Sequence, residues 1–172
     1  MIDFQNQTLD VTQLPRFEMV EGNPIDRAYL RVLRLFYCIW LIVLFGGLLA
    51  TNYFADIPPF LFYIVLSALM VFFSIYILET EKGFPRRRFG VREKDIIFQR
   101  GYLFFKQTIV PYNRIQHVEI KQDLIFRAFG IYSLKLFTAG SSSGDLSLVG
   151  LNKTDADKLK AVILKGASKD ED

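Results

Sequence analysis

The sequence predicts a membrane α-hairpin of two transmembrane helices, followed by a mainly-β cytosolic domain that ends in one packing helix. Three observations support this fold class. Residues 35–55 and 57–78 each contain no Asp, Glu, Lys or Arg. Beyond residue 79, short runs alternate apolar and polar side chains, which is typical of β-strands. A final stretch, 154–166, has the apolar spacing of an amphipathic helix.

Both uncharged stretches are long enough to cross a bilayer, because a helix needs about 20 apolar residues to span the hydrocarbon core. Asn23 is a favourable N-cap for the first helix, Pro24 suits its first turn, and Asp26 suits its positive end. Pro58 and Pro59 suit the turn and the start of the second helix. Aromatic residues expected to anchor the helices at the membrane interface are Tyr37, Trp40 and Tyr53.

Two glycines, Gly46 and Gly47, lie within the first apolar stretch. Small residues let two membrane helices approach closely. The simpler interpretation is packing within the hairpin, and a dimerisation face is the alternative.

The charge pattern predicts that both termini are cytoplasmic. Arg27, Arg31 and Arg34 precede the first helix, and residues 82–135 hold twelve Lys and Arg against four acids. The connection 51–59 contains no Lys or Arg. Excess Lys and Arg near the ends of membrane helices marks the cytoplasmic side.

Alternating patterns predict about six antiparallel strands, at 88–92, 96–99, 103–112, 115–121, 131–138 and 146–149. Residues 93–95 are expected to form a turn, and Arg100-Gly101 a tight hairpin turn. A flexible loop is predicted at 139–145.

Two helices are predicted within this domain. Residues 123–130 have helical apolar spacing, with Gly130 as the C-cap. The final helix has Thr154 as its predicted N-cap and ends at Gly166. Its apolar stripe comprises Leu159, Val162 and Ile163. The predicted organisation is therefore a cytosolic N-terminal segment (1–23), a hairpin (24–79), a β-domain (80–166) and a disordered tail (167–172).

Four short segments carry a family resemblance: PYNRIQHV (111–118), FRAFGI (126–131), FTAG (137–140) and LVGL (148–151). Together with the preceding hairpin, they resemble the bacterial pleckstrin-homology (PH)-like domain family, specifically its YdbS-type small membrane proteins. The resemblance covers residues 25–165. It implies a PH-like barrel of two bent antiparallel sheets closed by the C-terminal helix, in a multi-pass protein of the bacterial inner or plasma membrane. It carries over no catalytic or ligand residues.

A basic cluster lies immediately after the second predicted helix and comprises Lys82, Arg86, Arg87, Arg88 and Arg92. Such juxtamembrane clusters attract anionic lipid head groups, with about 1 kcal/mol per basic residue near the surface. The simpler interpretation is that these residues only set the topology. By the resemblance, Arg88, Arg92, Lys94 and Arg100 lie where eukaryotic PH domains bind phosphoinositides. Phosphoinositide binding is not expected, because Glu93 and Asp95 lie among these four residues.

No catalytic or metal site is predicted. His117 is the only histidine and Cys38 the only cysteine, which excludes a usual metal site or a disulfide within one chain. The serines at 141–143 lie in a glycine-flanked loop without a nucleophile elbow. We therefore expect no enzyme activity, no cofactor, no small-molecule substrate and no nucleic-acid partner.

Phe126 and Phe129 lie on the predicted short helix. Core packing is the default interpretation. An exposed apolar patch that meets a partner or the membrane surface is the alternative.

The leading hypothesis for function is a membrane-anchored interaction module. It would be a subunit of a complex with a larger multi-PH-domain membrane protein or with itself. The alternative is a reader of anionic lipid head groups at the cytoplasmic membrane face. The role of residues 1–22 is open.

Overall fold

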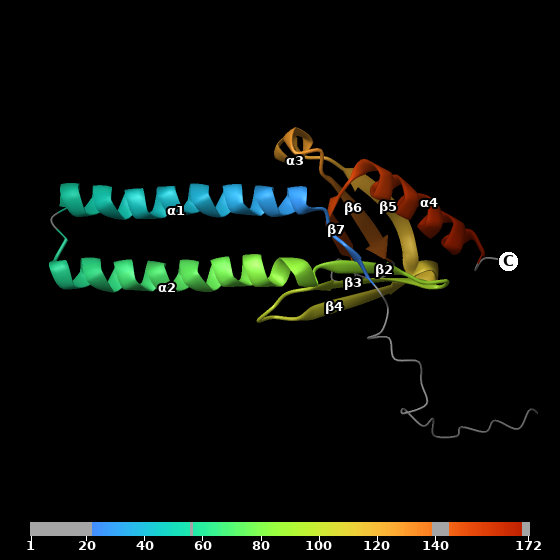
Figure 1. Cartoon of the computed structure of the whole chain (residues 1–172), viewed down its shortest axis with the longest axis horizontal. Helices are drawn as coiled ribbons and strands as arrows, with labels where there is room; N and C mark the ends of the chain where they lie inside the picture. The colour runs from blue at the N-terminus through green and yellow to red at the C-terminus, as the bar shows by residue number, and fades with distance from the viewer. Residues whose placement is uncertain (1–21, 56, 139–144, 170–172) are drawn as a thin grey trace, which may run out of the picture.

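The structure is a computed structural model that describes residues 22–55, 57–138 and 145–169. Residues 1–21 of the N-terminal segment, Asp56 in the predicted turn, residues 139–144 of the predicted loop and residues 170–172 of the tail lie outside the described residues. Figure 1 shows a long helical hairpin on one side and a domain of two sheets on the other.

The hairpin consists of α1 (Arg27–Ala55) and α2 (Pro59–Gly83), which lie side by side (Figure 1). Both helices are long and apolar enough to cross a membrane, and only 6% of each apolar window is buried. Phe45 and Phe73 pack between the helices, with ring centroids 5.8 Å apart. The hairpin predicted from the uncharged stretches is therefore present, with its apolar surface turned outwards.

The first helix begins later than the sequence predicts. Asn23 is not the N-cap, because Asn23–Pro24 form the short strand β1 and pair with Phe89 and Arg88 of the sheet. The cap is Asp26, whose Oδ1 accepts a hydrogen bond from the backbone N–H of Ala28 at 2.8 Å. Pro59 occupies the first turn of α2, as predicted.

Gly46 and Gly47 do not serve the packing within the hairpin. A Cβ added at either glycine would meet no atom within 4 Å. The glycines therefore leave an open stretch of α1 backbone on the outer surface of the hairpin.

The domain contains two antiparallel sheets that form a PH-like sandwich. The first sheet has the order β1-β2-β3-β4 and the second β5-β6-β7. Beyond β1, the strands are β2 (Arg88–Val91), β3 (Asp95–Arg100), β4 (Lys106–Pro111), β5 (Ile115–Lys121), β6 (Tyr132–Thr138) and β7 (Leu146–Leu151). Single-turn 3₁₀ helices, η3 (Phe84–Arg86) and η4 (Tyr112–Arg114), precede β2 and β5. Each predicted strand is found; β5 has the predicted bounds, and the other five have shifted ends.

One core joins both sheets and the last helix. Ile96 of β3, Leu134 of β6 and Leu148 of β7 are fully buried in it, as is Ile163 of the last helix. Each Å² of apolar surface that is removed from water stabilises the fold by about 25 cal/mol, so such contacts are the main stabilising term of the domain.

The connection between β3 and β4 is longer than predicted. Instead of a tight turn at Arg100-Gly101 and a strand from Leu103, residues 101–105 form a loop, and β4 begins at Lys106. The reason is a side chain of the hairpin: the carboxylate of Glu79 accepts the backbone N–H groups of Tyr102 and Leu103, which are therefore not available to a sheet.

The helix α3 (Leu124–Ala128) is found at the predicted place and is followed by Gly130 with φ +67°. The helix α4 (Lys153–Lys169) differs from the prediction at three points. Its cap is Asn152, whose Oδ1 accepts the N–H of Asp155, rather than Thr154. It continues past Gly166 to Lys169. Val162 is 45% exposed, because the face of α4 that packs on the core carries Ala156, one turn before Leu159, instead of Val162.

Candidate functional site

The hairpin is joined to the domain by close packing at the start of α1. The N–H of Asp26 donates to the carbonyl of Gly150 in β7 at 2.9 Å, and Ile25 is buried in the core of the sandwich. Gly150 has φ +97°, and a Cβ there would lie 2.4 Å from Cγ2 of Ile25 and 2.8 Å from Cδ1 of Tyr29. A side chain at residue 150 would push α1 away, so glycine is required for this approach.

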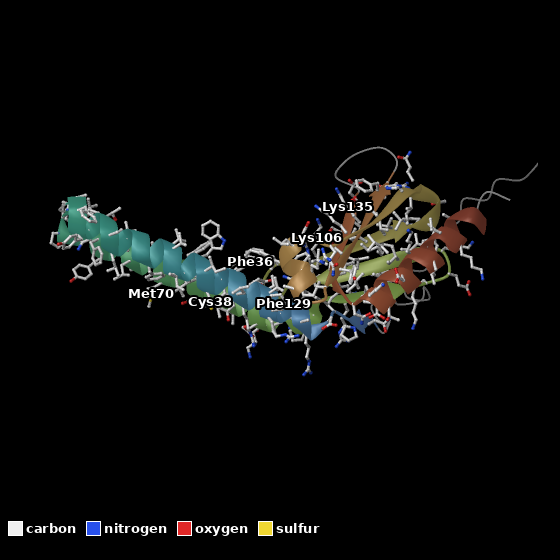
Figure 2. All side chains as sticks on the ribbon, turned by 90° about the horizontal axis from the view of Figure 1, so that it is seen from above. Phe36, Cys38, Met70, Lys106, Phe129 and Lys135 are labelled. Atoms are coloured by element: carbon white, nitrogen blue, oxygen red, sulfur yellow. The ribbon has the colours of Figure 1, made fainter. Side chains whose placement is uncertain are left out.

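Aromatic rings surround this junction. The ring of Tyr29 stands edge-on to Phe126 with centroids 6.0 Å apart and tilted to Phe84 at 6.5 Å. Phe129 packs with Phe36 against the small cluster around Val32, and Figure 2 shows both labelled residues beside the first turns of α1. The hairpin and the domain are thus coupled by a continuous apolar contact.

Phe126 and Phe129 are both half-buried against α1. This position is neither the core of the sandwich nor a free surface patch. The apolar side chains that α3 does expose are Leu124, which is 85% exposed, and Ile125, which is 39% exposed. Neither of these two residues was singled out from the sequence.

A cavity of about 740 Å³ lies at the base of the hairpin. Its charged lining residues are Asp26, Arg27, Arg31, Arg34, Glu81 and Arg88. We refer to it as the arginine cavity. Four guanidinium groups and two carboxylates give it a positive character.

Both carboxylates of the arginine cavity have partners. Glu81 accepts two hydrogen bonds from Arg34, at 2.8 Å from Nε and 2.6 Å from Nη2, and Asp26 caps α1. Within the described residues, Arg27, Arg31 and Arg88 form no ion pair. Of these three, Arg88 donates one hydrogen bond from Nε to the carbonyl of Pro85 at 3.4 Å. No carboxylate of the described residues therefore neutralises these three guanidinium groups.

The predicted basic cluster is divided by the fold. Lys82 and Arg88 are both exposed, and of these two only Arg88 lines the arginine cavity. The guanidinium of Arg86 lies 4.6 Å from the ring centre of Tyr102, and that of Arg87 lies 5.6 Å from the ring centre of Tyr29. The Nε of Arg87 is buried without a hydrogen-bond partner in the described part of the chain.

Arg92 lies apart from the other four cluster residues, beyond the far end of β2. It forms two hydrogen bonds of 2.6 Å with Asp95, which raise the pKa of the Arg92 guanidinium. Its carbonyl accepts the hydroxyl of Tyr112 at 2.9 Å. Arg92 is therefore committed to the β2–β3 turn.

The arginines of α1 were not predicted from the sequence as site residues. Arg27, Arg31 and Arg34 were assigned to topology alone. Their spacing of four and three residues places them on one face of a helix, which is the signal that points to a shared site.

Within the described residues, no three His, Cys, Asp or Glu side chains come together. His117 is exposed on β5, with its ring 5.7 Å from that of Phe137, and Cys38 is exposed on α1.

Comparison with known proteins gives one family and one relative. The bacterial PH domain family matches residues 30–167. The transmembrane protein YdbS of Bacillus subtilis (strain 168) is 30% identical over 73 residues, which are 42% of this chain and 44% of that protein. The similar segment thus spans less than half the length of the relative. No solved structure matches the chain.

Proposed function

Because the chain belongs to the bacterial PH domain family, we propose that it is a membrane-anchored PH-like module that binds anionic lipid head groups in the arginine cavity. Its association with membranes follows from the two apolar helices and the similarity to a transmembrane protein. The proposed role is binding rather than catalysis.

Three arginines of the arginine cavity carry this proposal, because Arg27, Arg31 and Arg88 form no ion pair with any described residue. Arg34 immediately precedes the apolar stretch of α1, and Glu81 follows that of α2 by three residues. The arginine cavity therefore lies where lipid phosphates are found if both helices cross the bilayer. Guanidinium groups bind phosphate oxygens through paired hydrogen bonds. Each basic residue near an anionic surface contributes about 1 kcal/mol.

We further propose that the hairpin crosses the membrane twice, with both termini in the cytoplasm. The basic residues at both helix bases support this orientation. Labelling tests it: a cysteine introduced as Lys160→Cys in a Cys38→Ser background should react with an impermeant maleimide in inside-out vesicles and stay unlabelled in intact spheroplasts. Labelling in spheroplasts would contradict this orientation.

Native mass spectrometry of the full-length protein, extracted gently from its own membrane, tests the lipid proposal. The wild-type protein should retain an anionic lipid class. The double variant Arg31→Gln/Arg88→Gln should lose it, because two of the four positive charges that line the arginine cavity are removed.

A matched control removes the same charge elsewhere. The variant Arg92→Gln/Arg114→Gln changes two arginines outside the arginine cavity and should retain the lipid. Equal loss in both double variants, or no anionic lipid on the wild-type protein, would overturn the proposal.

An interaction subunit is the second candidate function, in a complex with a larger multi-PH-domain membrane protein or with a second copy. The open backbone at Gly46 and Gly47 supports it, since another helix can approach there. In the same mass spectra, a stoichiometric second polypeptide should be lost in Gly46→Leu and kept in Ala68→Leu, which changes an exposed position on α2. A strictly monomeric wild-type protein would exclude this candidate.

A further inference from the structure

The loop between β3 and β4 exposes an unusual concentration of large apolar side chains. Within residues 101–105, which we name the aromatic loop, Leu103 is 48% exposed, Phe104 79% and Phe105 61%. The transfer of such side chains from water to an apolar environment is favourable. A contiguous apolar projection of this kind marks a surface that meets a partner or a membrane.

The aromatic loop is held in a defined shape. The carboxylate of Glu79 accepts the N–H of Tyr102 at 2.9 Å and that of Leu103 at 2.7 Å. Gly101 has φ +98°, and a Cβ there would lie 2.0 Å from the carbonyl oxygen of Phe104. The guanidinium of Arg86 covers the ring of Tyr102. The exposed side chains are therefore presented by a constrained loop.

The position of the aromatic loop points to the membrane. Figure 1 shows the connection between β3 and β4 running back alongside α2, towards the hairpin and away from the rest of the sheet. Its anchor, Glu79, immediately follows Leu78, the last residue of the uncharged stretch of α2. The loop thus lies beside α2, level with the boundary of the proposed bilayer.

The charges at the base of the aromatic loop fit the same surface. Arg100 and Lys106 are direct cross-strand partners in the register of β3 and β4, and both are exposed. Like charges directly opposite each other destabilise a strand pair in water. Lipid phosphates would offset this repulsion while the apolar tip contacts acyl chains.

We propose that the aromatic loop inserts Leu103, Phe104 and Phe105 into the leaflet next to the domain, with Arg100 and Lys106 among the phosphates. The domain would then be held against the bilayer at a point distinct from the arginine cavity, which contains no residue of the loop. The inference rests on the proposed crossing of the membrane by α2.

Tryptophan fluorescence in vesicles tests this insertion on the full-length chain. Trp40 is the only tryptophan, so the variant Trp40→Phe/Phe104→Trp carries a single fluorophore in the aromatic loop, which we name the loop tryptophan. In vesicles of mixed phosphatidylcholine and phosphatidylglycerol, its emission should shift to the blue. Lipids brominated near the head group should quench most of its intensity.

The matched control is Trp40→Phe/Leu164→Trp, whose single fluorophore we name the α4 tryptophan. Leu164 is 50% exposed on the C-terminal half of α4, which Figure 1 shows on the far side of the domain from the hairpin. The α4 tryptophan should emit as tryptophan does in water and should not be quenched by brominated lipid.

Two results would overturn the insertion. The first is quenching of the loop tryptophan by brominated lipid that is no stronger than quenching of the α4 tryptophan. The second is protection of the loop tryptophan from acrylamide without quenching by lipid, which would indicate a covering protein.

Trp40 of the wild-type protein separates failure of the loop from failure of the anchor. Quenching of Trp40 together with an unquenched loop tryptophan would refute the loop alone. An unquenched Trp40 would refute the membrane anchor and the insertion together.

A second substitution, Phe105→Asp in the Trp40→Phe/Phe104→Trp background, should return the loop tryptophan to water, whereas Leu164→Asp in that background should leave its quenching unchanged.

Discussion

The carboxylate of Glu79, near the end of α2, accepts a hydrogen bond from the backbone N–H of Leu103 at 2.7 Å. A residue of the hairpin thereby fixes a loop of the β-domain that lies 24 positions further along the chain. The orientation of the aromatic loop is consequently set by the helix beside it.

Substitution Glu79→Ala should release the aromatic loop. A hydrogen bond to a charged group contributes about 1.5–3 kcal/mol, so the amides of Tyr102 and Leu103 should exchange with deuterium at least about tenfold faster. The control Glu93→Ala removes an exposed acid in the β2–β3 turn and should leave this exchange unchanged. Unaltered exchange in Glu79→Ala would show that Glu79 does not hold the loop.

Substitution Gly150→Ala should destabilise the junction between α1 and the sandwich. The positive φ costs about 1–2 kcal/mol for an L-residue, and the added Cβ would overlap Ile25 and Tyr29. Gly130→Ala is the matched control, since φ is +67° there but nothing lies within 4 Å. Thermal unfolding should show the larger decrease for Gly150→Ala, and equal decreases would contradict the close approach.

Substitution Gly166→Ala should destabilise the domain even though Gly166 lies inside a helix. In an exposed helix, Gly→Ala gains about 1 kcal/mol. Here the Cβ would lie 2.4 Å from Cδ2 of Tyr112, and overpacking costs about 1–3 kcal/mol. A decrease in the unfolding temperature is expected; an increase, as for a solvent-exposed helix, would refute the packing of Gly166 on the ring.

Tyr112 should make stability depend on pH in the alkaline range. The residue is 1% exposed, and burial raises the pKa of its phenol above 10.0, with a smaller contribution from Asp95. The contribution of the buried phenol to the free energy of unfolding is fully present below about pH 10, the pKa of tyrosine in the unfolded chain. Above this pH the unfolded chain loses the proton before the folded protein does. The contribution is lost as the pH rises through the folded pKa. Titration of absorbance at 295 nm should lose one phenol that ionises above the ordinary range in Tyr112→Phe, and an unchanged titration would refute the shift.

Local chemistry was sufficient to predict much of this fold. The uncharged stretches 35–55 and 57–78 predicted α1 and α2, and the alternation over 115–121 predicted β5 with the same bounds. Hydropathy and periodicity indicate which face of each helix or strand is apolar, and the folded chain turns that face away from water.

Capping and turn predictions failed where a distant residue competed for the backbone. Asn23 has the chemistry of an N-cap, but its backbone pairs with Phe89 in the sheet. Leu103 has the pattern of a strand, but Glu79 binds its N–H. The chemistry of one residue does not indicate whether a residue tens of positions away will bind its backbone.

The sequence by itself determined two apolar helices of spanning length, a domain of alternating strands and a basic cluster after the second helix, because composition and periodicity are local properties. The PH-like character of the domain came from the resemblance of four short segments. Only the tertiary structure decided which of the basic residues share a site. It brings Arg31 of α1 and Arg88 of β2 to one cavity and leaves Arg92 bound to Asp95. The physical reason is the docking of Ile25 and Tyr29 onto Gly150, which fixes the position of α1 relative to the sheets through contacts across more than half the chain.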